Sequence, residues 1–359
     1  MIICRTPFRI SFFGGGTDYP AWYRAHGGAV LAATIDKYCY LTCRYLPPFF
    51  EHSIRIVYRK IETCAAIEEI SHPAVREALR FLQIDRGIEL HHDGDLPARS
   101  GMGSSSAFTV GLLHALHALR GEMPTKHQLA KESITIEQDV LQETVGSQDQ
   151  VMAAYGGLRH VKFRSDGEIL VNPLVLPLER IAELKAHLML FYTGISRTAA
   201  DVARSYVVGI ESRSRQLRIM KELVDESIDI LASGTHLGAF GDLLHEAWLA
   251  KRSLSPRVSN SAVDALYERA RAAGAVGGKL TGAGGGGFLL LFVPPDKQAA
   301  VLDALDKQLH VPFDFESVGS QIIFYEPGVD YREAERARRH QPPVQFQELS
   351  HVSLATEAS

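Results

Sequence analysis

A glycine- and serine-rich segment at residues 96–107 has the composition of a phosphate-binding loop. Gly101 and Gly103 let a ligand approach the backbone closely, and the segment runs directly into an apolar helical pattern. The N–H groups at such a helix start attract anions. The segment is not a Walker A loop, because no Lys-Ser/Thr pair follows its glycines. A serine-capped helix after a glycine turn is the alternative. The residues expected to bind phosphate are Gly101, Met102, Gly103, Ser104, Ser105 and Ser106.

A second glycine-rich segment, residues 277–288, matches the dinucleotide-binding pattern G-x-G-x-x-G only formally. That pattern should follow a strand and open a helix, whereas this segment leads into the apolar strand pattern 288–293. Ordering the four consecutive glycines at 284–287 costs chain entropy. A backbone that approaches a ligand or a neighbouring phosphate loop is therefore a better explanation than a plain hairpin.

Charged residues near these loops could bind a hydroxyl group. Residues 8–19 form a strand pattern that ends in three glycines, with Arg9 and Asp18 beside them. A carboxylate held at such a turn suits the binding of sugar hydroxyls, and an Asx-type turn cap is the alternative. Glu137 and Asp149 lie twelve residues apart across a glycine break, and solvated helix faces are the alternative explanation for this pair.

The elements that must position these residues mix strands and helices without strict βαβ alternation, which predicts an α+β fold. The Pro-containing stretch 172–177 is the expected domain boundary, giving domains at 1–175 and 176–330 and a tail at 331–359. The predicted strands are 2–13, 30–35, 38–45, 54–58, 160–163, 188–192, two around the second glycine segment, and 316–325; the predicted helices are 104–121, 126–142, 148–156, 198–232, 238–252, 260–273 and 296–309.

The composition is that of a globular chain with a small-molecule partner. The 359 residues carry 38 basic and 42 acidic side chains, for a net charge of −4, without a long basic run. Nucleic acid and a membrane surface are therefore not expected as partners. Residues 1–16 lack the apolar stretch of a secretory signal, and four cysteines in a chain of this length fit a reduced, cytoplasmic setting.

The order and spacing of these segments resemble the motifs of the GHMP kinase superfamily. The family's first motif, A-P-x-R/K before a glycine-bearing turn, is matched between residues 6 and 18. Its phosphate loop, P-x-x-x-G-L-G-S-S-A, is matched by residues 97–107, with Met102 in place of Leu and Ser106 in place of the first Ala. Its third motif, K-x-T/S-G-A-G-x-G-G, is matched by residues 279–287. The resemblance implies a two-domain fold, with an N-terminal mixed α/β domain and a C-terminal α+β sandwich domain.

The resemblance also implies a role for each matched residue. In the family, a serine of the phosphate loop and a helical glutamate hold Mg²⁺ against the phosphates of ATP, and Ser105 and Glu137 match them. Asp149 matches the aspartate beside the acceptor hydroxyl, and Arg9 would orient that carboxylate and offset charge during phosphoryl transfer. ATP and Mg²⁺ are the implied cofactors, a sugar phosphate and ATP are the implied partners, and a homodimer stays open. The residues expected to bind the acceptor are Gly14, Gly15, Gly16, Thr17, Asp18, Gly284 and Gly285.

Within the superfamily, the sequence resembles the heptose kinases. Its turn at 14–19 reads GGGTDY, whereas galactokinases have GEHTDY at this place. The resemblance implies transfer from ATP to the anomeric hydroxyl of D-glycero-D-manno-heptose 7-phosphate, giving the 1,7-bisphosphate for nucleotide-activated heptose and surface polysaccharide. Ser196 and Arg197, before a helix, would bind the 7-phosphate, and a capped helix with an exposed Arg is the alternative. The competing functions are another anomeric sugar kinase, such as a fucokinase, and a non-catalytic sugar- and nucleotide-binding regulator.

Overall fold

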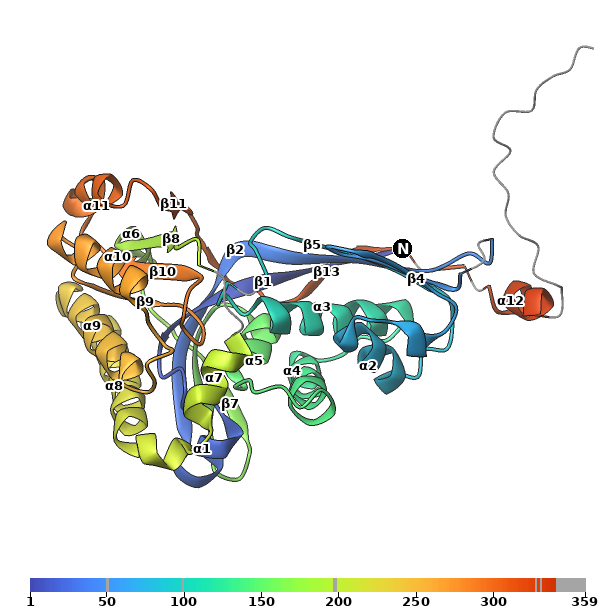
Figure 1. Cartoon of the computed structure of the whole chain (residues 1–359), viewed down its shortest axis with the longest axis horizontal. Coiled ribbons are helices and arrows are strands. Elements are labelled where there is room, and N and C mark those ends of the chain that lie inside the picture. The colour runs from blue at the N-terminus through green and yellow to red at the C-terminus, as the bar shows by residue number, and fades with distance from the viewer. Residues whose placement is uncertain (50–51, 99, 196–198, 327, 330, 340–359) are drawn as a thin grey trace, which may run out of the picture.

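The computed structural model describes residues 1–49, 52–98, 100–195, 199–326, 328–329 and 331–339. These residues form two lobes, each built on one sheet (Figure 1). The larger lobe has a nine-stranded sheet and the smaller lobe a four-stranded sheet. The architecture is the expected α+β fold, with a mixed N-terminal sheet and an antiparallel C-terminal sheet.

The larger sheet is organised around its two longest strands, β1 (Ile2–Phe13) and β2 (Gly28–Tyr45), which pair antiparallel. β2 is one strand where the sequence predicted two, at 30–35 and 38–45. It stays continuous because it changes partner along its length, from β6 (Leu158–Phe163) to β5 (Ile88–Gly94). The remaining strands are β3 (Ile54–Val57), β4 (Ile61–Cys64), β7 (Ile169–Pro173), β12 (Phe315–Glu316) and β13 (Gln321–Tyr325).

The last two strands of this sheet come from the far end of the chain. β12 pairs with β2, and β13 pairs with β1 beside the N-terminus (Figure 1). The sequence predicted a single strand at 316–325, whereas the structure divides that segment between two partners. The larger sheet therefore receives strands from both ends of the chain, and the boundary expected at 172–177 stays a prediction.

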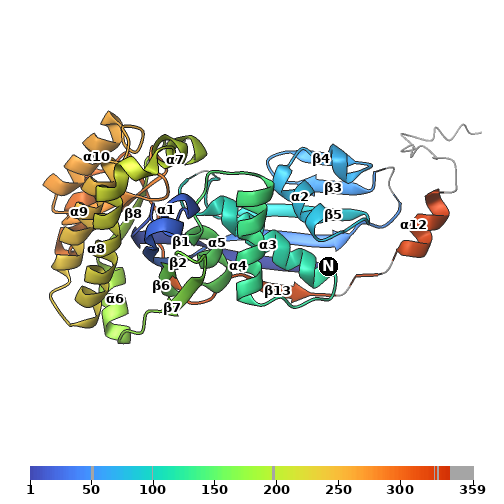
Figure 2. The ribbon, with the colours of Figure 1, turned by 90° about the horizontal axis from the view of Figure 1, so that it is seen from below.

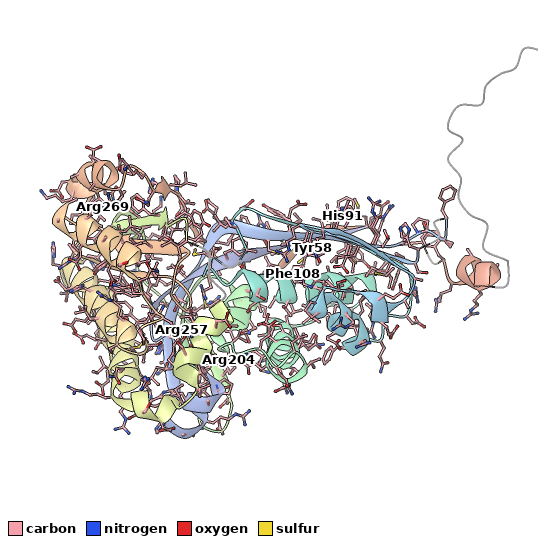
Figure 3. The ribbon with its side chains drawn as sticks, in the orientation of Figure 1. Tyr58, His91, Phe108, Arg204, Arg257 and Arg269 are labelled. Atoms are coloured by element: carbon pink, nitrogen blue, oxygen red, sulfur yellow. The ribbon has the colours of Figure 1, made fainter. Side chains whose placement is uncertain are left out.

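Helices pack on one face of the larger sheet, as both ribbon views show (Figures 1 and 2). They are α2 (Pro73–Phe81), α3 (Ser104–Leu119), α4 (Lys126–Ile134) and α5 (Gln148–Tyr155). Phe108 of α3 lies on this helical side, and His91 of β5 lies on the opposite side of the sheet (Figure 3). α3 is buried on nearly all sides, as its uniformly apolar sequence requires. The helix predicted at 126–142 is α4 followed by a π-helical turn, Thr135–Val140.

The smaller lobe is an antiparallel sheet with helices on its outer side (Figure 1). The predicted helix 238–252 is α9 (Gly238–Arg252). The helix predicted at 198–232 is interrupted at Gly209, whose φ is +74°, so it forms α7 (Ala199–Val207) and α8 (Ser214–Ala232). The sheet consists of β8 (Leu188–Tyr192), β9 (Gly277–Leu280), β10 (Phe288–Phe292) and β11 (Leu309–His310), and the lobe also contains α6 (Leu178–Ala186), α10 (Ser261–Ala272) and α11 (Gln298–Ala304). Two helices lie elsewhere: α1 (Pro20–His26) connects β1 to β2, and α12 (Arg332–Arg339) lies beyond the far end of the larger sheet (Figure 1).

Aromatic packing joins the two lobes at the end of β1. The Phe240 ring of α9 makes edge-on contacts with Phe12, at a centroid distance of 5.8 Å, and with Phe13, at 5.1 Å. All three rings are fully buried. The end of β1, which leads into the first glycine turn, is therefore fixed against the C-terminal lobe. Among the described residues, no helix combines the length and the apolar character that crossing a bilayer requires.

Candidate active site

The phosphate loop enters α3 from the junction of the two lobes. Met102 is fully buried, and its carbonyl oxygen accepts a hydrogen bond from the Arg9 backbone N–H at 3.1 Å. The loop is thereby attached to β1 through its own backbone. Gly103 then precedes the first turn of α3 with a φ of +73°. The N–H groups of that turn lie at the N-terminal end of a 16-residue helix, which favours an anion, and the binding of phosphate by residues 101–106 stays a prediction.

The second glycine segment lies directly against the phosphate loop. A Cβ placed on Gly282 would be 2.6 Å from the Gly101 Cα, and one on Gly101 would be 2.7 Å from the Thr281 carbonyl oxygen. Only glycines allow two backbones this close. The prediction that this segment approaches a phosphate loop is confirmed by these contacts.

Gly284 and Gly285, predicted to bind the acceptor, pack on another part of the C-terminal lobe. The Gly285 N–H donates to the Val258 carbonyl oxygen at 2.8 Å, and the Asn260 side chain donates to the Gly285 carbonyl oxygen at 3.3 Å. The contacts of these two glycines therefore fix the loop before α10, and their part in binding the acceptor stays a prediction.

Arg9 and Asp149 form a bidentate ion pair beside the phosphate loop. Arg9 Nε donates to Asp149 Oδ1 at 2.7 Å, and Arg9 Nη2 donates to Oδ2 at 2.6 Å. Arg9 Nη1 donates to the Gly101 carbonyl oxygen at 2.8 Å. The Arg9 side chain is 5% exposed and that of Asp149 is 24% exposed, so the carboxylate keeps an open side. The sequence prediction that Arg9 orients Asp149 agrees with this geometry.

Asp18 ties the first glycine turn to the helix that carries Asp149. Its Oδ1 accepts from the Gly16 N–H at 2.8 Å, and its Oδ2 accepts from the Gln148 side chain at 3.0 Å. Asp18 is almost completely buried, and burial raises its pKa, with a smaller contribution from the nearby charge of Asp149. The structure thus gives Asp18 a positioning role at residues 14–18, and the binding of the acceptor by this turn stays a prediction.

Glu137 lies in the π-helical turn beneath the phosphate loop. Its Oε2 accepts from Ser106 Oγ at 2.8 Å and from Gln150 Nε2 at 2.5 Å. Its Oε1 is buried and has no hydrogen-bond partner among the described residues. Burial raises the pKa of this carboxyl group to about 7. A buried carboxylate oxygen without a partner, next to an anion site, fits a hard divalent cation such as Mg²⁺.

The hydroxyl group that contacts Glu137 is that of Ser106, whereas Ser105 is the serine expected to hold Mg²⁺ together with Glu137, and that role of Ser105 stays a prediction. Neighbouring residues of an α-helix point about 100° apart, so only one of the two hydroxyls can face Glu137. Ser105 is exposed on the first turn of α3. A metal ligand from this turn therefore has two candidate serines.

Sequence reasoning missed several residues of this site. Gln148 and Gln150 flank Asp149 and hold Asp18 and Glu137, and the pattern Gln-Asp-Gln was the only signal for them. Lys251 is buried near the site although its neighbours in the sequence are those of an ordinary helix end. The predicted phosphate-binding residues Ser196 and Arg197 lie outside the described residues.

Comparison with known proteins finds relatives over the whole site. The description "GHMP kinases N terminal domain" matches residues 65–157, which include the phosphate loop, Glu137 and Asp149. The description "GHMP kinases C terminal" matches residues 215–311, which include the second glycine segment.

Individual relatives cover most of the chain. A D-glycero-alpha-D-manno-heptose 7-phosphate kinase from Campylobacter jejuni is 28% identical over 327 residues, 87% of this chain and 95% of that protein. A mevalonate kinase from Methanothermobacter thermautotrophicus is 30% identical over 240 residues, 63% of this chain and 74% of that protein. The crystal structure of a D-glycero-D-manno-heptose 1-phosphate kinase from Bacteroides thetaiotaomicron has a TM-score of 0.75 at 22% identity, over 91% of this chain and 100% of that one.

Proposed function

This chain belongs to the GHMP kinase superfamily, and we propose on that premise that it phosphorylates the anomeric hydroxyl of D-glycero-D-manno-heptose 7-phosphate. The chain is an ATP-dependent kinase that phosphorylates alcohol groups, and its acceptor class is a sugar. The heptose as acceptor is supported by the Campylobacter relative and by the residues of the first glycine turn. The product would be the 1,7-bisphosphate, together with ADP.

The observation that carries the chemistry is the partly exposed carboxylate of Asp149 beside the phosphate loop. Its inner side is held by Arg9, and its outer side is open to an acceptor hydroxyl. In the proposed step, the hydroxyl oxygen bonds to the γ-phosphorus as the bond to the β,γ-bridging oxygen breaks, and the hydroxyl proton passes to Asp149. Arg9 keeps the carboxylate oriented and offsets its negative charge.

The phosphate loop is the proposed site of the ATP phosphates. The N-terminal end of α3 and the glycine backbone supply N–H groups and a positive dipole end for them. Glu137, with a serine hydroxyl of the same turn, would hold Mg²⁺, which neutralises charge on the phosphates when it is bound. Ser106 and Gln150 orient the Glu137 carboxylate from its other oxygen.

The first test is ATP turnover with a panel of acceptors: D-glycero-D-manno-heptose 7-phosphate, galactose, fucose, mannose 6-phosphate and mevalonate. We expect ADP formation with the heptose phosphate alone, a new anomeric phosphate in the ³¹P NMR spectrum, and no turnover once EDTA has removed Mg²⁺. Turnover only with an unphosphorylated sugar would discard the heptose phosphate and keep the kinase. Silence with every acceptor would favour a binding protein without catalysis.

Arg197 is the residue that we propose for the 7-phosphate. It precedes α7 in the sequence, and the exposed Arg204 of α7 lies near the exposed Arg257, with a hydrogen bond of 2.7 Å from Ser205 Oγ to Ser255 Oγ between the two segments (Figure 3). A doubly charged phosphate at the far end of the sugar needs cationic contacts of this kind.

Replacing Arg197 by alanine should raise the KM for the heptose phosphate roughly 10- to 100-fold. A hydrogen bond to a charged group contributes about 1.5–3 kcal/mol, and this is the corresponding loss of affinity. Steady-state kinetics should show that the KM of R197A for ATP stays within about twofold of the native value. Arg218→Ala, at an exposed position on α8, is the matched control and should leave both constants unchanged. An unchanged KM for the phosphosugar in R197A would remove Arg197 from the site.

A further inference from the structure

Two lysines are buried beside the Arg9–Asp149 pair, and the steps proposed above use neither. Lys251 lies in the last turn of α9 and is 4% exposed, and Lys279 lies on β9 and is 3% exposed. Burial, with the positive charge of Arg9 nearby, lowers the pKa of Lys251 to about 7. Burying an ammonium group is unfavourable by several kcal/mol unless partners compensate it. The partners of these two Nζ atoms therefore indicate why the lysines are there.

Lys251 holds the start of the second glycine segment. Its Nζ donates to the carbonyl oxygen of Leu280, at 3.1 Å, and to that of Gly282. These two carbonyls belong to the peptide units before and after the Thr281–Gly282 peptide, so one side chain holds the segment at two points. Thr281 and Gly282 also lie against Gly101 of the phosphate loop. The segment therefore contacts both Lys251 and the phosphate loop.

Lys279 attaches the same strand to the larger sheet. Its Nζ donates to the Phe12 carbonyl oxygen at 2.7 Å. Phe12 lies on β1, between Arg9 and the glycine turn at 14–18. The segment 280–282 is therefore held both to α9 and, through Lys279, to the strand that carries Arg9.

The contacts continue from this segment to the catalytic pair. The Gly101 carbonyl oxygen, next to Gly282, accepts a hydrogen bond from Arg9 Nη1 at 2.8 Å. The other nitrogens of the Arg9 guanidinium hold Asp149. Because the guanidinium is planar and rigid, a displacement of Gly101 would be passed to the Asp149 carboxylate.

We propose that Lys251 is a positioning residue for phosphoryl transfer: its two hydrogen bonds hold the segment 280–282 at its contact with the phosphate loop and so set the positions of Arg9 and Asp149. This inference rests on the catalytic role proposed above for that pair. Lys251 acts through the backbone and does not need to contact either substrate. Errors of about 1 Å in such a constellation are enough to lower turnover about 100-fold.

The test compares two substitutions of Lys251 with one of Lys221. Lys251→Met keeps most of the side-chain volume and removes both hydrogen bonds, and Lys251→Gln restores an N–H donor without the charge. We expect K251M to lower kcat at least tenfold and to raise the KM for ATP at least fivefold, with partial recovery in K251Q. Lys221 on α8 also donates to a backbone carbonyl, that of His26 at 3.1 Å, and within the described part of the chain it makes no hydrogen bond to the phosphate loop. K221M should keep both constants within twofold.

A second readout separates this inference from the choice of acceptor. Calorimetric titration with ATP depends on the phosphate loop and not on the sugar, so weaker ATP binding by K251M supports the positioning role even if the heptose phosphate is not the acceptor. Native kcat and native ATP affinity in folded K251M would overturn the inference. A loss of activity that only matched the loss of folded protein, with K251Q no better than K251M, would also overturn it. Failure of both variants to fold would overturn it as well. In both cases Lys251 would act on stability alone.

Discussion

Replacing Asp149 by asparagine should lower kcat roughly 10³-fold and leave the dissociation constant of ATP within about threefold. Asparagine keeps the shape of the side chain but cannot take the hydroxyl proton, and a general base contributes about 10²–10⁴-fold to such a step. A 10³-fold loss corresponds to about 4 kcal/mol in the activation free energy. ATP binding should persist because asparagine keeps the shape of the side chain beside Gly103, and the carboxylate hydrogen bonds that are lost go to Arg9. Single-turnover kinetics and calorimetry measure the two quantities separately.

A double variant shows whether the loss in D149N is catalytic or structural. With Asp149 neutral, the Arg9 guanidinium is buried without its carboxylate, and breaking a buried pair in this way destabilises a protein by about 3–5 kcal/mol. Adding Arg9→Gln removes the unpaired charge, so R9Q/D149N should recover most of the lost thermal stability. Its turnover should stay as low as that of D149N. Recovery of activity together with stability would show that Asp149 only supports the fold.

The parts of the fold that the sequence predicted well are those set by local patterns. The start of α3 at Ser104 and the whole of α9 follow from apolar spacing and from the glycine or serine at their ends. Local sequence contains this information, so these two helices needed no knowledge of distant contacts. The pairing of Arg9 with Asp149 joins residues 140 apart in the chain, and only the resemblance to the GHMP kinase motifs indicated it.

The parts that the sequence did not reveal depend on contacts between distant residues. β13 pairs with β1 across more than 300 residues, and nothing in the segment 316–325 indicates that it returns to the first sheet. Ser106, rather than Ser105, faces Glu137, because the π-helical turn and the helix rotation together decide which hydroxyl is presented. The local sequence around Lys251 is that of an ordinary helix end, and its burial results from tertiary contacts. The sequence therefore predicted the motif residues of the candidate site but not the residues that hold those motifs in place.

Replacing Gly282 by alanine should raise the KM for ATP at least tenfold and lower the melting temperature by several degrees. The new Cβ would lie 2.6 Å from the Gly101 Cα, so the phosphate loop or the second glycine segment must move. The residue also has a φ of +64°, which is unfavourable for alanine by about 1–2 kcal/mol. Overpacking against the backbone adds about 1–3 kcal/mol. Steady-state kinetics in ATP and differential scanning calorimetry measure the two effects.

Gly121→Ala separates the effect of the close contact from that of the backbone conformation. Gly121, after the end of α3, has a similar φ of +77°, but a Cβ there would meet nothing within 4 Å. G121A should therefore lose only the stability that the left-handed conformation costs, and its KM for ATP should stay within twofold of the native value. If G282A matched G121A in both measurements, the two glycine segments would not need to touch for ATP to bind. Because Lys251 and Arg9 are connected through this contact, a native KM in G282A would also remove the path by which Lys251 positions the catalytic pair.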